Sequence, residues 1–529
     1  MTDLLNSPAR PIIVLLLGAL AIGLLDRLSR PRDRGILLVL LVADGALALL
    51  SLSTRLPLHI VLGQWRDLPL LGCDWGLGMD NLAFLFAAAM LCVALALSVA
   101  AVGHPPIPRA PLLVLLAAGL GLIFSADLIA LSASGFILDM AFAWAVISVD
   151  GTERGFRPAT WMVGMGGLAN LTLLTAALTL CLDGDFPALD GVPSSPLALL
   201  LVTVAALARL GIYPLYFWLP RHVEGSQVAR AWLHLIPVAT GLWLPTHAYV
   251  LAQGAWPWPV FLLILGGVGF LAAAVLAWGE TQPARVLSWV ILAQLGYGLV
   301  LITLGTSPLP VAINLLLGAG LLFVGPSFTA IWRRVSTGWG RWHWAVEIPS
   351  AVGVGMLAGV PGSLGLVGRI VLYRALLNQG PMSLLAASLL AESLLVAALL
   401  RAWLAHDFGA QETSTSTDHP LIRWSLLIAV VMLVAAGLIV GFHPPLLVRS
   451  LAGGVTLPSL FTLLRGTTLA QAAAIILPLV GGVALHLYQV ETYDLNSSFD
   501  SKGILVTHNA VKELNRIFID SLSRKGLPI

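Results

Sequence analysis

The feature that most constrains this chain is a succession of long apolar runs that continues almost from one end to the other. A bilayer core about 30 Å thick needs about 20 apolar residues in a helix, and about fifteen runs here meet that requirement. Charged residues make up only 10% of the chain, against about 25% in soluble proteins. Because helices and closed barrels alone satisfy their backbone in lipid, these runs predict an all-α polytopic membrane protein of about 14–15 transmembrane helices.

The predicted spans are joined by short loops, so no soluble domain is inserted between them. They are 11–29, 35–53, 81–102, 110–125, 127–148, 158–182, 195–213, 228–250, 257–278, 284–304, 308–332, 347–377, 382–403, 424–441 and 469–488. The stretch 445–465 is less clearly apolar and leaves the exact helix count open between 441 and 470. Residues 490–529 are polar and hold all three lysines, and we expect a cytoplasmic amphipathic tail there, with a plain solvated tail as the alternative.

Loop charge predicts the orientation, because basic residues accumulate in cytoplasmic loops. With the spans alternating, one side collects fifteen arginines and the other collects six. The fifteen are Arg27, Arg30, Arg32, Arg34, Arg109, Arg154, Arg157, Arg221, Arg230, Arg285, Arg333, Arg334, Arg341, Arg401 and Arg423; the six are Arg10, Arg55, Arg66, Arg374, Arg449 and Arg465. We therefore expect a multi-pass protein of the cell inner membrane with an extracytoplasmic N-terminus and a cytoplasmic tail.

A few charged or titratable residues lie inside the predicted spans. A charge at the bilayer centre costs at least about 2.5–3.5 kcal/mol, so such residues are functional or paired by default. They are Asp44, Asp139, Arg209, His234, Arg369 and Glu392. Asp44 fits an interfacial role, Glu392 is a candidate partner of Arg369, and a packed core histidine remains the alternative for His234.

Two of the buried arginines lie beside residues that end or break helices. One is in "ALARLGIYPLYFWLP" (206–220) and the other in "AGVPGSLGLVGRIVL" (358–372). The breaking residues are Gly211 and Pro214 beside Arg209, and Pro361 and Gly362 beside Arg369. Two interrupted spans in corresponding halves are typical of transporters with inverted repeats. The freed backbone groups must line a polar cavity or be buried in protein. The alternative for each arginine is a structural ion pair or a snorkelling side chain.

These segments, in this order, resemble the antiporter-like membrane subunits of respiratory complex I, of Mrp sodium/proton antiporters and of energy-converting hydrogenases. The resemblance covers roughly residues 75–405 and is carried by "LGMDNLAFLF", "SADLIALSASGFILDM", "ARLGIYPLYFWLP", "VEGSQVARAWLHLIPVATGLWL", "ARVLSWVILAQLGYGLVL" and "MLAGVPGSLGLVGRIVL". It places Asp139 on the family's essential glutamate, Arg209 on the seventh-helix lysine, His234 on an eighth-helix histidine and Arg369 on the ionisable residue of the broken twelfth helix. The largest complex I subunit of this kind is the most similar.

The resemblance implies two inverted five-helix repeats, each with a half-channel, in which the acid pairs with the seventh-helix cation. It divides the chain into N-terminal helices (1–105), a first half-channel repeat (106–250), a second inverted repeat (251–405), C-terminal helices (406–489) and the tail (490–529). The expected ion pathway consists of Asp139, Arg209, His234, Arg369 and Glu392.

The sequence departs from the family pattern at the residues that are ionisable in the family. The glutamate is replaced by the shorter Asp139, and lysines are replaced by Arg209 and Arg369, which stay protonated because the pKa of arginine exceeds about 12. The eleventh-helix segment "AINLLLGAGLLFVG" carries no charge, and Tyr216 stands where the family has a histidine. Two interpretations follow. Either the arginines are fixed charges while His234 and water carry the proton, or conduction is lost or altered.

The expected function is therefore translocation of a proton or another cation as one subunit of a complex I-like or Mrp-like assembly. One alternative is the membrane subunit of a two-component inorganic carbon uptake system coupled to a cation gradient, and another is a non-conducting scaffold. We expect no catalytic, cofactor-binding or metal-binding site in the chain itself, since Cys73, Cys92 and Cys181 lie far apart. Expected partners are other membrane subunits, membrane lipid, and either a soluble redox module or a large soluble zinc protein; no nucleic-acid partner is expected.

Overall fold

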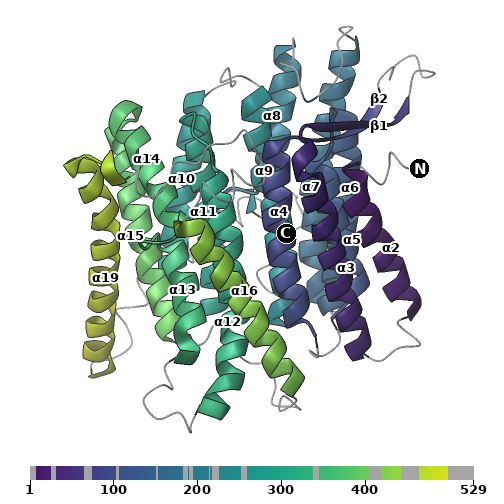
Figure 1. The fold of residues 1–529 in the computed structure, drawn as a ribbon. Helices are drawn as coiled ribbons and strands as arrows, with labels where there is room; N and C mark the ends of the chain where they lie inside the picture. Colours follow the sequence, from purple (N-terminus) through teal and green to yellow (C-terminus); the bar gives the residue numbers. More distant parts are fainter. Residues whose placement is uncertain are drawn as a thin grey trace.

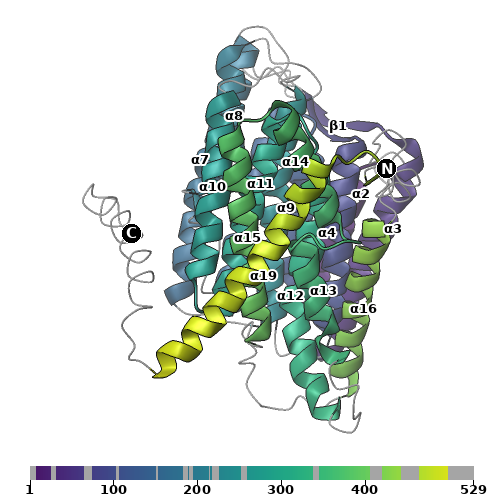
Figure 2. The same ribbon diagram turned by 90° about the vertical axis from the view of Figure 1, so that its left-hand side faces the viewer.

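A computed structural model describes residues 7–25, 31–64, 74–102, 107–150, 153–182, 189, 195–213, 215–216, 226–251, 259–336, 345–405, 420–442 and 464–498. Within these ranges the chain forms a bundle of long helices that stand side by side (Figures 1 and 2). Nearly the whole of the predicted tail, from residue 499 on, and the break residue Pro214 lie outside the described residues.

The N-terminal helices are α2 (Ala9–Leu25), α3 (Pro31–Leu52) and α4 (Asn81–Ala100), with a short 3₁₀ turn, η1 (Ser53–Arg55), after α3. The central helices are α5 (Arg109–Ile123), α6 (Leu128–Asp150), α7 (Glu153–Leu182), α8 (Pro196–Leu210), α9 (Gln227–Leu251), α10 (Pro259–Gly279), α11 (Pro283–Thr303), α12 (Leu309–Ser336), α13 (Ile348–Leu357), α14 (Leu364–Gln379) and α15 (Met382–Leu404). The last helices are α16 (Pro420–Phe442) and α19 (Leu469–Ser498). The predicted polytopic helical class is confirmed.

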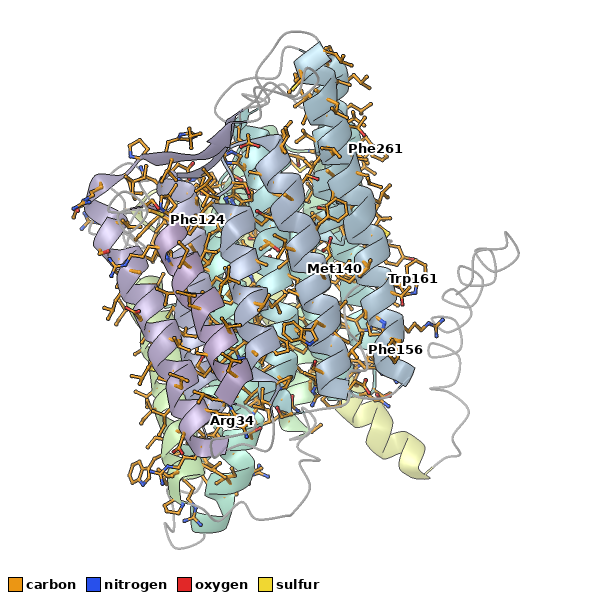
Figure 3. The ribbon with its side chains drawn as sticks, turned by 90° about the vertical axis from the view of Figure 1, so that its right-hand side faces the viewer. Arg34, Phe124, Met140, Phe156, Trp161 and Phe261 are labelled. Carbon is orange, nitrogen blue, oxygen red and sulfur yellow. The ribbon has the colours of Figure 1, made fainter. Side chains whose placement is uncertain are left out.

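Ten helices of the described part are long and apolar enough to cross a membrane, and α2, α5, α8 and α13 are shorter apolar helices. Several large apolar side chains on the outside of the bundle remain exposed. Met140, Phe156 and Phe261 are more than half exposed on α6, α7 and α10, and Figure 3 shows them on the outer surface. Such a surface is costly in water and matches the environment of lipid acyl chains.

Polar residues begin several helices where the sequence would place a cap. Asp80 accepts a hydrogen bond of 2.7 Å from the Ala83 amide at the start of α4. Asp127 does the same for the Ala130 amide of α6, at 2.6 Å. These side chains satisfy backbone donors that the first helical turn leaves unpaired.

A two-stranded antiparallel hairpin was not predicted from the sequence. β1 (Leu58–Gln64) pairs with β2 (Asp74–Met79), with Leu58 opposite Met79. The hairpin crosses one end of the bundle (Figure 1), where the Gly76 amide donates to the Asp127 carboxylate at 3.0 Å. The hairpin is a small addition to a fold whose predicted all-α class is confirmed. Local sequence hardly indicates the second strand, because β2 (DWGLGM) has two glycines and no β-branched residue.

Both predicted helix breaks are present within the described residues. α8 ends at Leu210, and Gly211 adopts a left-handed conformation with φ of 65°. The predicted span 347–377 is two helices, α13 and α14, joined through Gly359 (φ 66°) and Gly362 (φ 91°). Glycine suits these positions because it has no Cβ to clash in left-handed conformations.

Two helices, α9 and α19, pack against helices that lie far from them in the sequence. α9 packs against α4, α5, α8, α11 and α12, so it joins α4, α5 and α8 to α11 and α12. α19 lies on the outside of α15 and α14 and crosses them at a slant (Figure 2). The division into two inverted five-helix repeats remains a prediction.

Candidate functional site

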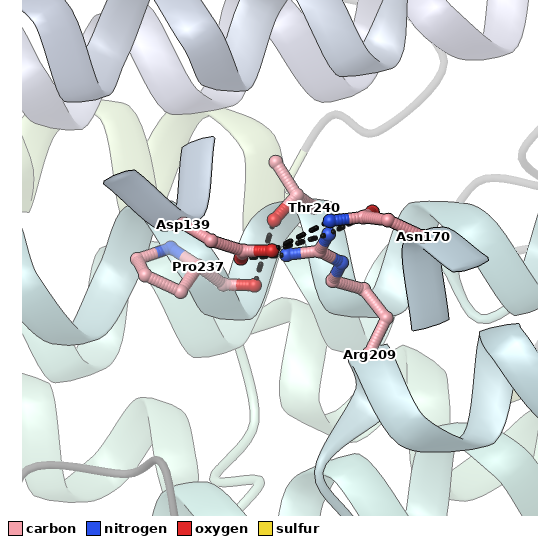
Figure 4. A network of polar contacts seen from close by, with 5 residues as sticks. All are labelled: Asp139, Asn170, Arg209, Pro237 and Thr240. Carbon is pink, nitrogen blue, oxygen red and sulfur yellow. Dashed lines mark hydrogen bonds and ion pairs between the residues drawn. The ribbon is translucent and has the colours of Figure 1, made fainter. Parts of the chain in front are cut away.

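The first buried polar cluster joins three helices, α6, α7 and α8. Asp139 on α6 and Arg209 on α8 form an ion pair and are only 1% and 3% exposed. Asn170 on α7 completes a closed network, shown in Figure 4. Its Nδ2 donates to Oδ2 of Asp139 at 2.7 Å, and its Oδ1 accepts from Nη2 of Arg209 at 2.7 Å. The carboxylate and the guanidinium are thus held by each other and by one amide.

Two glycines leave the room that this cluster occupies. A Cβ on Gly135 would lie 2.1 Å from Oδ1 of Asn170 and 2.7 Å from Nη2 of Arg209. A Cβ on Gly166 would lie 2.1–2.4 Å from the carboxyl atoms of Asp139. Real Cβ contacts are never so short, so the absence of side chains at these two positions is a steric requirement of the ion pair.

α9 brings backbone polar groups close to the same cluster. Pro237 interrupts its hydrogen bonding, because proline has no amide hydrogen to donate. Thr240 Oγ1 donates to the Pro237 carbonyl at 2.9 Å, and both residues lie beside Asp139 and Arg209 in Figure 4. One residue further along, the Cβ position of Gly241 is 3.0 Å from the carbonyl oxygen of Arg209. The break after α8 is therefore packed directly on α9.

His234 lies on α9, one turn before Pro237, and connects that helix to the second half of the bundle. The residue is 2% exposed. Its Nδ1 is 2.8 Å from the Arg230 carbonyl, and its Nε2 is 3.4 Å from Oγ of Ser288 on α11. Its ring packs against Phe323 of α12, with the centroids 5.2 Å apart. A carbonyl acceptor at Nδ1 orients the ring so that Nε2 faces Ser288.

The second buried ion pair joins α14 and α15. Nε of Arg369 lies 2.9 Å from Oε2 of Glu392, and each side chain is 4% exposed. Gly359 in the helix break packs on the guanidinium, since a Cβ there would lie 2.5 Å from Nε of Arg369. The buried hydroxyl groups of Tyr297 and Tyr373 lie within electrostatic range of the pair. The left-handed glycine thus lets the break approach a buried charge.

The end of α13 is closed by a residue of α12. Nδ2 of Asn314 donates to the Met356 carbonyl at 2.9 Å, and the same carbonyl accepts from the Gly359 amide at 3.1 Å. Asn314 lies in the segment in which the sequence shows no charge, and it is 2% exposed. A neutral amide therefore supports the break where the resemblance leads one to expect an ionisable residue.

The structure brings four of the expected pathway residues into two pairs. Asp139 contacts Arg209, and Arg369 contacts Glu392, while His234 contacts Ser288 of α11. Asn170 was missed, although it is the one amide in the apolar stretch "GGLANLTLLTAAL". Gly135, Gly166 and Ser288 were missed as well, because nothing local distinguishes them from packing residues. Among the described residues, no group of three or more His, Cys, Asp or Glu side chains could hold a metal ion.

Part of the chain that holds this arrangement is similar to known membrane proteins. Residues 158–325 match the family model described as NADH:quinone oxidoreductase/Mrp antiporter, TM. The chain is thus similar to this family over residues 158–325 of its 529 residues. The matched segment contains Asn170, Arg209, His234 and Asn314, whereas Asp139, Arg369 and Glu392 lie outside it. The predicted resemblance is confirmed.

Relatives and a solved structure extend the likeness along the chain. A protein of Rhizobium meliloti described as a probable K(+)/H(+) antiporter component is 27% identical over 265 residues, which are 46% of this chain and 26% of that one. An NADH-quinone oxidoreductase subunit N of Streptomyces griseus is 26% identical over 450 residues, which are 79% of this chain and 92% of that one. The chain thus spans about a quarter of the first relative and nearly all of the second.

The fold is also that of a chain in the Mrp complex of a Dietzia species. The TM-score is 0.77 at 20% identity, and the superposition covers 98% of this chain and 60% of that one. At this identity the likeness establishes the fold, including the long bundle that holds both buried pairs.

Proposed function

We propose that this chain moves a cation, the proton in the first instance, across the membrane as one subunit of a hetero-oligomeric complex. The observation that carries the proposal is the closed cluster of Asp139, Asn170 and Arg209 inside a bundle of apolar helices. Buried charges of this kind are costly, and in membranes they mark ion pathways more often than they serve stability alone. The match of the segment around Arg209 to the NADH:quinone oxidoreductase/Mrp antiporter family model supports the same function.

The arginines act in this proposal as fixed positive charges. A guanidinium does not release its proton in the range in which proteins work, so neither Arg209 nor Arg369 is a carrier. Asp139 and Glu392 can change partner or protonation state, and each change alters the local field that a mobile proton meets. In this proposal Arg209 and Arg369 set the electrostatic potential at the two buried ion pairs.

His234 is the proposed carrier between the two pairs. Histidine is the side chain best suited to take up and release a proton in a relay. Its Nε2 faces Ser288 of α11, and α9 continues from His234 to the turn that packs on Arg209. α9 thus carries one side chain that contacts α11 and a turn that packs on Arg209 of the first pair, as a relay between them requires.

Substitution of Asp139 tests the proposal. In membrane vesicles that hold the assembled complex, Asp139→Asn should abolish cation flux, followed with a pH-sensitive dye, while the complex still assembles. Asp44→Asn is the matched control, since Asp44 is an exposed carboxylate on α3, remote in sequence from the cluster. Unchanged flux in an assembled Asp139→Asn complex would refute translocation by this path.

A non-conducting scaffold is the second candidate, and one observation favours it. Arg209 and Arg369 are each already paired with a carboxylate, and closed pairs of this kind also serve to lock helices together. In that case Asp139→Asn would lower the yield of assembled complex and leave the flux per assembled complex unchanged. Inorganic carbon uptake remains an untested alternative, with no structural feature of its own in the described residues.

A further inference from the structure

Three arginines of the described residues are almost fully buried, and they differ in what they face. Arg209 and Arg369 each contact a carboxylate, as described above. Arg109, at the first position of α5, is 4% exposed, yet no described carboxylate lies within ion-pair distance of it. An unpaired buried charge is far more costly than a paired one. Arg109 therefore requires an anion that the described chain does not supply.

The surroundings of Arg109 strengthen that requirement. Its Nε and Nη2 are buried and have no hydrogen-bond partner. These two donors form the edge of the guanidinium that takes a carboxylate or phosphate in a bidentate manner. The charge that acts on it is another cation, Arg34 of α3, within electrostatic range. α5 also begins here without a side-chain cap, so its positive end adds to the same field.

We propose that Arg109 and Arg34 bind the phosphate group of an anionic membrane lipid. Arg109 directly precedes the apolar run of α5, which places it at the level where a helix enters the bilayer. α3 presents exposed apolar side chains within two turns of Arg34, namely Ile36 at 42% and Leu40 at 61% exposure. Figure 3 shows Arg34 at the end of the bundle, with the outer surface of α3 above it.

A lipid fits this surface better than a soluble anion does. α2 packs against both α3 and α5, and its outer side chains Leu20 and Leu24 are 62% and 68% exposed. Acyl chains lying along α2 and α3 would bring a headgroup to the same end of the bundle as the two arginines. The phosphate would then receive the bidentate edge of Arg109 and the charge of Arg34. This site is independent of any ion path through Asp139.

The test is a lipid titration of the full-length chain in detergent, with bound lipid counted by native mass spectrometry. Phosphatidylglycerol should bind the wild-type chain more tightly than phosphatidylcholine does. Arg109→Gln should weaken the first phosphatidylglycerol about tenfold, the size expected for loss of one charge-assisted pair. Arg157→Gln, which removes an exposed arginine at the same end of the bundle, should change the affinity less than about twofold.

Further variants keep the test decisive. Arg109→Lys retains the charge and loses the bidentate edge, so its affinity should lie between those of the wild type and Arg109→Gln. Should Arg109→Gln not fold, Arg109→Lys and Arg34→Gln must each show weaker binding. Wild-type affinity in every Arg109 and Arg34 variant, or an equal loss in Arg157→Gln, would overturn the proposal.

A parallel arm separates the sources of the anion. Inorganic phosphate at millimolar concentration is added in phosphatidylcholine, and the thermal unfolding of wild type and Arg109→Gln is compared. We expect no protection that depends on Arg109. Protection by phosphate alone would assign the site to a soluble anion, and a carboxylate of a neighbouring subunit found on Arg109 in the assembled complex would assign it to that subunit. Either result would contradict a lipid site.

Discussion

Asn170 holds both members of the first ion pair at once. The Asn170→Ala variant leaves Oδ2 of Asp139 and Nη2 of Arg209 with one partner fewer each. Loss of hydrogen bonds to buried charged groups costs about 1–3 kcal/mol, so we expect the free energy of unfolding to fall by about that amount. Thermal unfolding in detergent measures it. Thr172→Ala, at a half-buried threonine of the same helix, is the control and should stay within about 0.5 kcal/mol of wild type.

Gly166 offers a sharper test, because the helix carries its own control. Alanine normally stabilises a helix relative to glycine by about 0.8–1 kcal/mol. Gly164 has nothing within 4 Å of its Cβ position, so Gly164→Ala should raise the melting temperature or leave it unchanged. Gly166→Ala should lower it, since the new Cβ would overlap the Asp139 carboxylate. Equal effects at both positions would show that the ion pair does not occupy the space assigned to it.

At the scale of elements, the break between α13 and α14 is the feature most exposed to a single substitution. Gly359→Ala forces a left-handed conformation that costs about 1–2 kcal/mol in other residues and displaces Arg369 as well. We expect a lower melting temperature and a lower yield of assembled complex. Gly355→Ala, inside α13 with only ordinary contacts at 3.7 Å, should behave as wild type. A tolerated Gly359→Ala would mean that the break is not held against Arg369.

The helices could be predicted from the sequence because their signal is local. Apolar runs of about 20 residues located α6, α9, α11 and α15 to within a few residues, and Pro361 with Gly362 located the second break. The hairpin was missed because its pairing and its contact with Asp127 join segments far apart in the chain.

The sequence predicts individual residues of the site, but it does not predict all the contacts between them. A charge in an apolar run is conspicuous, so Asp139, Arg209 and Arg369 could be selected from the sequence. The sequence names Glu392 as a candidate partner of Arg369, but their contact depends on how α14 packs on α15. The role of Asn170 depends on how α7 packs on α6 and α8. Those contacts follow from tertiary packing, which hydrophobic periodicity does not encode.

At the scale of the whole molecule, the arginine bias predicts which end of the bundle is cytoplasmic. A cysteine placed at Thr281, between α10 and α11, should react with an impermeant maleimide only after the membrane is opened. One placed at Ser307, between α11 and α12, should react in intact cells. Both variants are made after Cys73, Cys92 and Cys181 are replaced. The opposite labelling pattern would invert the predicted orientation.

We propose that Arg209 acts as a fixed positive charge beside a conducting path. The most direct measurement is cation flux through the assembled complex with Arg209→Lys and with Arg209→Gln, normalised to the amount assembled. We expect that lysine, which keeps the charge opposite Asp139, retains most of the flux, and that glutamine loses it. Flux that survives in Arg209→Gln, or that disappears in a fully assembled Arg209→Lys complex, would contradict it.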